Sequence, residues 1–418
     1  MAKLAIDGRK RLTGEVCIQG AKNTALPVIG ASLLADCGVT VIKNCPDILD
    51  VRELLGIMEG IGCRYEFSQN ELHIYKDKIN GVPDFYKCRN LRASIVLMGA
   101  LLSCIKYFVL PYPGGCKIGR RPIDFHIDGL RKMGAVIEEC DDEILGYCRG
   151  LYGTDYTFPY PSVGALENLL LSAVCAEGIS IFRGCATEPE IVDLCDFLNR
   201  MGAKITGAGT GEIVVRGVKK LKACTYTIPG DRIVAGTYMT ACGIAGGNIK
   251  LKNIIPKRVE QIGEILKKTG CHVFTDGERN EIIVLADGRR KAVPCIITSP
   301  WPGFPTDMQS QIMGLSTYFD GSTRIVDNVF EGRYATAFEL GKMGAEILVD
   351  ENGVTVQGKE RLYGADVEAR DLRGGAALVI AALGAQGITT VEHCEYIMRG
   401  YEDIQRDLEQ LGASISWL

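Results

Sequence analysis

The chain has 418 residues, of which 47% are hydrophobic and 23% are charged, as in an ordinary globular protein rather than a disordered or fibrous one. Its formal net charge of -4 provides no general basic excess for binding nucleic acid, so any cluster of cations must be a local site. A chain of this length predicts more than one domain, because a single hydrophobic core rarely extends over so many residues.

The same sequence predicts a cytoplasmic protein without contact to membranes. Residues 1–16 carry scattered charges and no apolar run, so no secretory signal is expected. The most apolar runs, 95–105 and 377–385, are shorter than the roughly 18 residues that a membrane helix needs. The 17 cysteines form no CxxC pair and the 4 histidines are scattered, which argues against a zinc site. Most cysteines are therefore expected to be reduced, small buried side chains.

One sequence unit recurs six times along the chain. Each unit begins with a helix that is apolar nearly all round and is expected to be buried: 23–35, 93–103, 165–176, 234–245, 308–319 and 375–385. Each continues through a short strand and an amphipathic helix to a turn glycine: Gly62, Gly134, Gly202, Gly270, Gly344 and Gly412. The gaps between these glycines are 72, 68, 68, 74 and 68 residues, so the repeat is regular.

Six units divide more readily into two domains of three than into one domain of six. The fourth unit starts near residue 229. We therefore expect an N-terminal domain of residues 22–229 and a C-terminal domain of residues 1–21 plus 230–418. Residues 1–21 resemble a trailing strand pair, which would close the C-terminal domain.

Polar residues gather at the starts of the predicted buried helices, which are equivalent positions of the repeat. They are Lys22 and Asn23, Arg92, Ser162 to Gly164, Asp231 and Arg232, Thr306 and Asp307, and Asp371 and Arg373. Helix capping accounts for hydroxyls and carboxylates there, with Ser162, Asp231 and Thr306 as good N-caps. It does not account for the cations, which oppose the helix dipole at an N-terminus. They instead suggest an anion held by helix ends and side chains together.

The loop "PYPGGCKIGRRP" at 111–122 makes the second unit about four residues longer than its siblings between strand and helix. Gly114 and Gly115 would permit backbone motion, so a mobile lid is predicted. Lys117, Arg120 and Arg121 would lower the pKa of the Cys116 thiol and attract an anion. The alternative is a surface loop with an incidental cysteine.

A second candidate stretch, "SPWPGFPTDMQSQ" at 299–311, places Asp307 at a helix start. Asp307 is either an ordinary first-turn carboxylate or a general base facing a basic site. Arg333 and Arg399, in the strand-to-helix loops of the fifth and sixth units, would add two cations.

Together these motifs resemble those of the enolpyruvyl transferases over nearly the full length. The stretches concerned are GAKNTALP, RASI, PGGCKIGRRPIDFHI, PSVGA, EPEIVD, PGDRI, FPTDMQ, FEGRY, DLRGGAALV and RGYEDI. The resemblance implies an α/β protein of two inside-out barrels (prisms), each of three repeats with buried helices and outer sheets, and an active site between them. It implies no metal and no organic cofactor.

The resemblance also implies a reaction: transfer of the enolpyruvyl group of phosphoenolpyruvate to the 3'-hydroxyl of UDP-N-acetylglucosamine, with release of phosphate. This is the first committed step of bacterial peptidoglycan synthesis. The implied catalytic residues are Cys116 as general acid, which is also the thiol that fosfomycin alkylates, Asp307 as base, Lys22 and Arg399. Phosphoenolpyruvate would be bound by Lys22, Asn23, Arg92, Arg121, Arg333, Arg373 and Arg399. The UDP-sugar would be bound by Asn23, Arg92, Arg121, Pro122, Ile123, Asp124, Phe125, Ser162, Val163, Gly164, Asp307 and Val329.

Three departures from the family pattern bear on affinity and inhibitor response: Leu166, Lys117 and Trp301.

Alternative functions remain open. One is the other main reaction of this fold, on shikimate 3-phosphate, although its pattern lacks the glycine-cysteine loop. Another is a non-catalytic protein that binds UDP-sugars, and a third is a thiol redox sensor built on Cys116. A binder would need neither a thiol acid nor a base, and the loop offers no resolving cysteine.

Overall fold

The computed structural model describes residues 2–114, 122–140, 142–288, 290–330 and 332–418. The chain divides into two compact units. Residues 20–228, apart from those outside the description, form what we call the N-terminal unit, and residues 2–19 with 229–418 form the C-terminal unit. The chain thus passes between the units at 19/20 and 228/229, where the sequence suggested 21/22 and 229/230.

The N-terminal unit is built around three apolar helices, α1 (Lys22–Ala31), α4 (Leu97–Ile105) and α6 (Val163–Ala173). Most of their side chains are buried, because each is apolar on nearly every face. The 3-10 turns η1 (Ser32–Leu34) and η2 (Arg92–Val96) adjoin them. Outer helices are α2 (Leu49–Gly60), α3 (Phe85–Asn90), α5 (Asp124–Lys132) and α7 (Pro189–Arg200).

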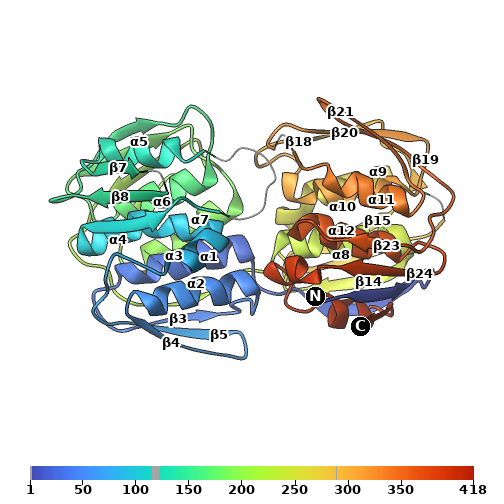
Figure 1. The fold of residues 1–418 in the computed structure, drawn as a ribbon, viewed down its shortest axis with the longest axis horizontal. Helices are drawn as coiled ribbons and strands as arrows, with labels where there is room; N and C mark the ends of the chain where they lie inside the picture. Colours follow the sequence, from blue (N-terminus) through green and yellow to red (C-terminus); the bar gives the residue numbers. More distant parts are fainter. Residues whose placement is uncertain (1, 115–121, 141, 289, 331) are drawn as a thin grey trace. The chain divides into compact units, whose positions relative to one another are not determined.

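Three sheets cover these helices within the described part of the N-terminal unit (Figure 1). The first has the order β13 (Thr225–Thr227), β3 (Val39–Lys43), β5 (Glu71–Lys76), β4 (Cys63–Ser68). The second is β6 (Tyr107–Pro111), β8 (Glu143–Tyr147), β7 (Val136–Cys140). The third is β11 (Lys204–Thr206), β12 (Glu212–Arg216), β10 (Ile179–Arg183), β9 (Asp155–Thr157). Buried and exposed residues alternate along most strands, so one face of each sheet meets the helices.

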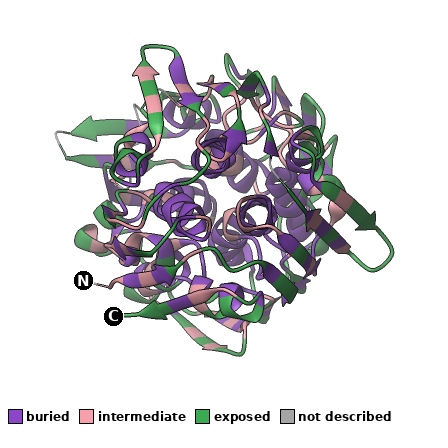
Figure 2. Cartoon of the chain, turned by 90° about the vertical axis from the view of Figure 1, so that its right-hand side faces the viewer, coloured by how far each residue is buried: buried purple, intermediate pink, exposed green. Residues whose placement is uncertain are grey.

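The C-terminal unit repeats this plan around α8 (Arg232–Ala245), α10 (Gln309–Ser316) and α12 (Leu372–Ala382), all of them almost fully buried. Figure 2 shows buried helices in the middle and strands with exposed residues around them. The 3-10 turns are η3 (Pro256–Val259), η4 (Thr306–Met308) and η5 (Cys394–Arg399). The outer helices are α9 (Glu260–Lys268), α11 (Ala335–Lys342) and α13 (Ile404–Gln410).

The sheets of the C-terminal unit incorporate the start of the chain. The first has the order β15 (His272–Asp276), β16 (Glu281–Ala286), β14 (Gly247–Lys252), β2 (Leu12–Cys17). The second is β18 (Cys295–Thr298), β20 (Ser322–Asp327), β22 (Gly353–Gln357), β21 (Glu346–Asp350). The third is β23 (Asp366–Glu368), β24 (Ile388–Glu392), β1 (Leu4–Asp7), β25 (Ser414–Trp417), and a small pair joins β17 (Arg290–Lys291) to β19 (Phe319–Asp320). The strand β1 therefore lies between β24 and β25, antiparallel to both.

The six predicted turn glycines all adopt the left-handed conformation, with φ between 86° and 107°. Residues with a Cβ rarely adopt such angles, which explains why glycine ends each of these amphipathic helices.

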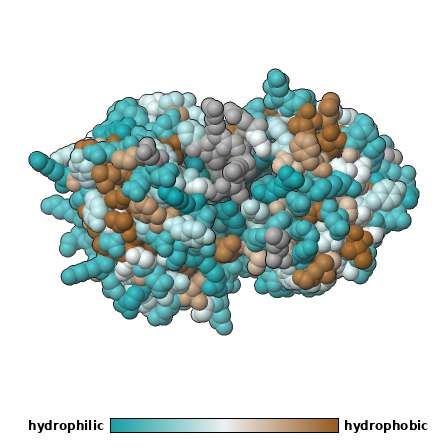
Figure 3. Space-filling view, in the orientation of Figure 1, coloured by the Kyte–Doolittle hydropathy of each residue, from teal (hydrophilic) through white to brown (hydrophobic). Residues whose placement is uncertain are grey.

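Each unit has its own hydrophobic core, and the surface drawn in Figure 3 mixes small apolar patches with polar side chains. Among the described residues, none of the helices is both long and apolar enough to cross a membrane. The sixteen cysteines within the description are free thiols.

Candidate active site

The polar residues singled out in the repeat do lie at the starts of the buried helices. Helix α1 begins at Lys22 and η2 at Arg92. The side chain of Ser162 caps α6, and Asp231 accepts hydrogen bonds from the backbone N–H groups at the start of α8 at 2.8 and 3.1 Å. Asp371 caps α12 in the same way. These carboxylates and hydroxyls satisfy N–H groups that a helix leaves unpaired at its first turn.

The capping role predicted for Thr306 is wrong. No side chain caps η4, and the Thr306 hydroxyl donates instead to the Asp327 carboxylate at 2.7 Å. Asp327 ends the neighbouring strand β20, and the Thr306 oxygen, which in a cap would accept from a backbone N–H, accepts from Arg333 Nη1 at 3.0 Å instead.

Asp307 lies between two arginines of the C-terminal unit. Its Oδ1 accepts from Arg333 Nη2 at 2.8 Å, and its Oδ2 accepts from Arg373 Nη2 at 3.2 Å. The two arginine side chains are only 6% and 3% exposed, whereas that of Asp307 is 23% exposed. Three of the predicted site residues are thus brought together, with the carboxylate nearest to solvent.

The electrostatics of this cluster are dominated by the cations. Burial by itself raises the pKa of Asp307, but Arg333, Arg373 and the more distant Arg232 outweigh it and hold that pKa well below its ordinary value. Arg232, the first residue of α8, lies over the ring of Trp301 at 5.7 Å. Asp307 and Asp231 are the carboxylates that act on Arg373 in return.

Two donors of the cluster have no partner. Arg333 Nε and Arg373 Nη1 are buried and form no hydrogen bond in the described structure. Leaving a charged donor buried and unpaired is costly, so such groups are typical of a site that receives an anion. Arg373 also lies over the ring of Tyr401 at 5.8 Å, which fixes its position from the other side.

Val329 and Arg399 are the other predicted residues of the C-terminal unit. The backbone N–H of Val329 donates to Asp327 Oδ1 at 2.9 Å, so Val329 is linked through Asp327 and Thr306 to the arginine cluster. Arg399 is the last residue of η5 and is partly buried. The segment after it is held by Gln19, whose side chain donates to Gly400 O at 3.2 Å and accepts from the N–H of Glu402 at 2.8 Å.

Lys22 of the N-terminal unit has a carboxylate partner that the sequence did not reveal. Its Nζ lies 2.6 Å from Asp50 Oδ2, and the two side chains are 12% and 6% exposed. Asp50 is in the first turn of α2. The hydroxyl of Thr24 donates to Asp193 of α7 at 2.8 Å, which ties the same end of α1 to a second carboxylate. Asn23, between them in sequence, is half-buried.

More carboxylates occur at the helix starts of the N-terminal unit. Burial, together with the nearby charges of Glu190 and Glu188, raises the pKa of Glu167 to about 8. Glu190 lies in the first turn of α7, and Glu188 directly precedes that helix. Three carboxyl groups of the N-terminal unit thus lie close enough to influence one another.

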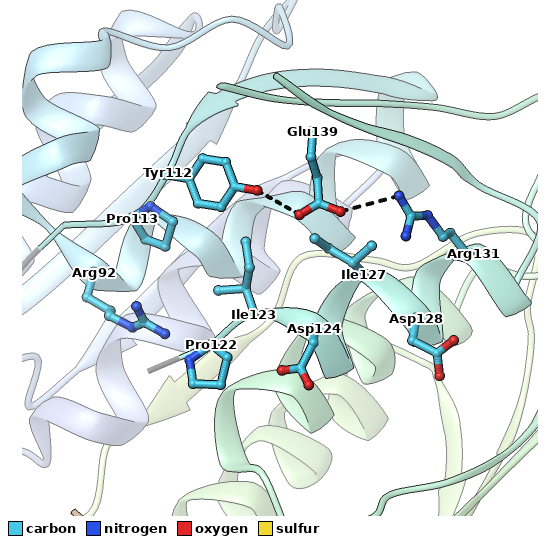
Figure 4. A pocket seen from close by; sticks show the side chains of 10 residues that line it. All are labelled: Arg92, Tyr112, Pro113, Pro122, Ile123, Asp124, Ile127, Asp128, Arg131 and Glu139. Carbon is cyan, nitrogen blue, oxygen red and sulfur yellow. Dashed lines mark hydrogen bonds and ion pairs between the residues drawn. The ribbon is translucent and has the colours of Figure 1, made fainter. Parts of the chain in front are cut away.

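A cavity of about 530 Å³ in the N-terminal unit brings together four of the predicted substrate-binding residues (Figure 4). These are Arg92, Pro122, Ile123 and Asp124, and the rest of its lining is Tyr112, Pro113, Ile127, Asp128, Arg131 and Glu139. It combines apolar walls with a few charged groups, as ligand sites commonly do.

One wall of the cavity is a hydrogen-bonded chain. The Tyr112 hydroxyl donates to Glu139 Oε2 at 2.6 Å, and Arg131 Nη2 lies 3.4 Å from Glu139 Oε1 (Figure 4). The hydrogen bond to Glu139 is the main cause that raises the pKa of Tyr112 to about 12. These contacts with Glu139 fix the position of the Tyr112 ring. No sequence motif pointed to Tyr112 or Glu139 as site residues.

The remaining predicted residues of the N-terminal unit lie close by in sequence. Phe125 is half-buried on α5, and Val163 and Gly164 form the first turn of α6. A Cβ at Gly164 would meet the His126 ring at 3.4 Å. His126 is buried and shares a 2.8 Å hydrogen bond with Asn168 of α6, which joins α5 to α6.

Cys116 and Arg121, with Lys117, Arg120 and Gly115, lie outside the described residues. For Gly114 the structure gives a different reason than the hinge we expected: a Cβ there would lie 1.7 Å from Arg89 O. Glycine is thus required at 114 because the backbone of α3 approaches it closely. Among the described residues, no group of three or more His, Cys, Asp or Glu side chains is arranged to hold a metal.

The burial of other cysteines bears on which thiol can react. Burial is the main cause that raises the pKa of Cys63, Cys88, Cys195, Cys242 and Cys394 to about 12. A thiol with a raised pKa is a poor nucleophile at neutral pH. These five are inert core residues.

Asp50 and Asp327 are the main residues that sequence reasoning missed. Asp50 begins an outer helix and Asp327 ends a strand, and neither position belongs to the repeated helix-start pattern. The first turns of α5, α7 and α9 also carry a carboxylate, so an acidic residue at the start of an outer helix did not by itself mark Asp50 as a site residue.

Known proteins resemble this chain over its full length. A family model described as EPSP synthase (3-phosphoshikimate 1-carboxyvinyltransferase) matches residues 6–408. UDP-N-acetylglucosamine 1-carboxyvinyltransferase 2 of Caldanaerobacter subterraneus is 45% identical, with 99% of each chain covered. UDP-N-acetylglucosamine 1-carboxyvinyltransferase of Thermotoga maritima is 40% identical, with 100% of this chain and 99% of the relative covered.

Solved structures share the fold. The enolpyruvyl transferase NikO from Streptomyces tendae superposes with a TM-score of 0.89 at 23% identity, covering 100% of this chain and 98% of the other. EPSP synthase from Acinetobacter baumannii gives 0.74 at 20% identity, with both chains covered completely. The mixed α/β architecture is therefore that of these transferases, and the resemblance seen in the motifs is confirmed: the chain belongs to the enolpyruvyl transferase family.

Proposed function

We propose that this protein transfers the enolpyruvyl group of phosphoenolpyruvate to the 3'-hydroxyl of UDP-N-acetylglucosamine, releasing phosphate, in the cytoplasm. The observation that carries the proposal is the Asp307 cluster, in which a solvent-facing carboxylate lies between two buried arginines that each keep an unpaired donor. The names of relatives 40–45% identical over the full length support this choice of substrates. The product would enter peptidoglycan synthesis.

The unpaired donors fit the carboxylate of phosphoenolpyruvate. Planar guanidinium groups bind carboxylates through paired N–H donors, and Arg333 Nε and Arg373 Nη1 are donors of this kind. Arg399 would add a third cation. Positive charge fixed before the substrate arrives also stabilises the anionic tetrahedral intermediate, because no reorganisation is needed during the reaction.

The same cluster would control the basicity of Asp307. While both arginines pair with it, Asp307 is a weak base, because its pKa is held well below the ordinary value. A substrate carboxylate would neutralise part of the positive charge and so raise the pKa of Asp307. Asp307 could then take the proton of the sugar 3'-hydroxyl as the oxygen adds to C2 of phosphoenolpyruvate.

The remaining roles follow from the family resemblance. Cys116 would donate the proton that C3 receives during addition, and loss of a C3 proton with phosphate would complete the elimination. Lys22 would bind the phosphoenolpyruvate anion at the start of α1, which no side chain caps. The cavity lined by Arg92, Pro122, Ile123 and Asp124 would receive part of the UDP-sugar.

We also propose that each unit is an inside-out barrel of three repeats. Three buried helices and three large sheets occur within the described part of each unit, and the turn glycines recur at matching places. This repetition supports the two-domain division.

One assay tests the function. Purified protein is mixed with phosphoenolpyruvate and either UDP-N-acetylglucosamine or shikimate 3-phosphate, and phosphate release is followed. Release with the UDP-sugar alone is expected. Release with shikimate 3-phosphate alone would assign the other reaction of the fold, and no release with either would favour a protein that only binds its ligands.

A further inference from the structure

The carboxylate of Asp327 is the most heavily hydrogen-bonded acceptor beside the Asp307 cluster. Its Oδ1 accepts from the Thr298 hydroxyl at 2.7 Å and from the backbone N–H groups of Val329 and Phe330 at 2.9 and 3.2 Å. Its Oδ2 accepts from the Thr306 hydroxyl at 2.7 Å. One side chain thus joins the end of β18, the residue before Asp307 and the segment that follows β20.

The direction of these hydrogen bonds is fixed by chemistry. An ionised carboxylate only accepts and a guanidinium only donates. The single proton of the Thr306 hydroxyl therefore goes to Asp327, which leaves a lone pair of Thr306 to accept from Arg333 Nη1 at 3.0 Å. If Asp327 did not take that proton, Thr306 would be less firmly oriented, and Arg333 would depend more on its hydrogen bond to Asp307.

A second chain runs from the same carboxylate in the opposite direction. The Thr298 hydroxyl donates to Asp327 and accepts from the backbone N–H of Asn328 at 3.3 Å. With the N–H groups of Val329 and Phe330, this fixes the backbone conformation of 327–330. Hydrogen bonds that end on a charged acceptor are stronger than neutral ones, and members of such a network reinforce each other.

We propose that Asp327 is a positioning residue that sets the phosphoenolpyruvate side and the UDP-sugar side of the site through two separate arms. The Thr306 arm orients Arg333. The Thr298 arm, with the backbone N–H groups, orients Val329. This rests on the proposed function, in which Arg333 binds the phosphoenolpyruvate carboxylate and Val329 contacts the UDP-sugar.

The hydrogen bonds of the two arms can be removed separately by substituting Thr306 or Thr298. Thr306→Val removes the hydroxyl at constant shape, and KM for phosphoenolpyruvate should rise about tenfold, as expected for one lost charge-assisted hydrogen bond, with KM for the UDP-sugar within about twofold. Thr298→Val should raise KM for the UDP-sugar about tenfold and leave KM for phosphoenolpyruvate within about twofold. Asp327→Ala should raise both KM values, because it removes both oxygens that accept the hydrogen bonds of the two arms.

Conservative variants separate positioning from general damage. Thr306→Ser and Thr298→Ser keep the hydroxyl and should recover the KM that the valine variant lost. Asp350→Ala is the matched control, since Asp350 belongs to the same sheet but pairs with Arg324, at 2.6 Å, away from the cluster. An Asp327→Ala variant with a lowered Tm and unchanged KM values would overturn the proposal, since that is the behaviour of a merely structural residue.

Hydrogen exchange gives a readout that needs no turnover. In Asp327→Ala the amides of Val329 and Phe330 should exchange at least about tenfold faster, while amides of the helix α12 keep their protection. Unchanged exchange at 329 and 330 would overturn the proposed arm. If the wild-type protein failed to release phosphate, the proposed function would fall, and this exchange experiment would still decide whether Asp327 orders the segment.

Discussion

At the helix starts, the two units pair buried cations with carboxylates in different ways. In the N-terminal unit Lys22 has one carboxylate partner, Asp50, and both side chains are nearly buried. In the C-terminal unit one carboxylate, Asp307, is shared by Arg333 and Arg373, and donors are left over. The first arrangement is balanced in charge, and the second is ready to accept a further negative charge.

Lys22 already has a fixed partner, whereas the arginines around Asp307 still have donors available for a ligand. A balanced buried pair keeps its geometry with or without substrate, because breaking it leaves a charge uncompensated. An excess of buried donors is costly, and a bound ligand that accepts from them removes this cost. We therefore expect substrate to change the electrostatics of the C-terminal cluster more than those of the Lys22–Asp50 pair.

The largest effect should come from breaking the shared arrangement. Asp307→Asn removes the proposed base and the charge that balances the arginines, so kcat should fall by about 10²–10⁴, the usual contribution of a positioned base. Steady-state phosphate release measures it, with Asp350→Asn as the control carboxylate. A kcat within about tenfold of the wild type would show that another group takes the proton.

A double-mutant cycle on the balanced pair should give the next largest effect. Lys22→Met leaves the Asp50 carboxylate nearly buried without its cation, which should cost about 3–5 kcal/mol of the free energy of unfolding in urea. The double variant Lys22→Met/Asp50→Leu should be more stable than Lys22→Met alone but equally inactive. Purely additive losses would mean that the two charges do not depend on each other.

The raised pKa of Glu167 in the N-terminal unit can be tested by measuring stability as a function of pH. Burial and the charges of Glu190 and Glu188 raise the pKa of Glu167 to about 8, so the folded state resists its ionisation. The stability contributed by protonated Glu167 is complete below the ordinary pKa and is lost as pH rises through the folded value. The Tm of Glu167→Gln, relative to the wild type, should therefore increase between about pH 5 and pH 9. The exposed Glu143→Gln on β8 should show no such trend, and a flat difference for Glu167→Gln would refute the assignment.

The smallest effect should come from a neutral donor. Tyr112→Phe removes the hydrogen bond to Glu139 at the cavity wall, which should cost about 1–2 kcal/mol in unfolding free energy and change KM for the UDP-sugar less than the charged variants do. Tyr147→Phe, whose hydroxyl is 3.5 Å from Glu138 on the surface, is the matched control. Equal losses in both variants would show that the cavity wall has no special importance.

The sequence predicted those features that depend on local patterns. Turn glycines, apolar helices and helix starts follow from the conformational limits of glycine, from hydrophobic periodicity and from capping chemistry, and all are repeated six times. The clustering of Asp307, Arg333 and Arg373 follows from their equivalent or neighbouring positions in the repeat.

Hydrogen-bond and ion-pair partners that lie outside the repeated sequence pattern could not be predicted. Asp50 lies 28 residues after Lys22, and Asp327 lies 21 residues after Thr306, so only the folded chain brings each pair together. The capping role of Thr306 failed for the same reason: its hydroxyl oxygen accepts from Arg333, 27 residues later in the sequence, instead of from a local backbone N–H. The roles of Cys116 and Arg121 stay predictions from the motif.

The position of β1 has a consequence for biosynthesis. Its neighbours β24 and β25 are synthesised long after β1, because the N-terminal unit and most of the C-terminal unit lie between them in the sequence. The N-terminal unit can therefore fold while β1 still lacks its partners. The sheet that contains β1 forms only once β24 and β25 have been synthesised, so the C-terminal unit is completed after the N-terminal one.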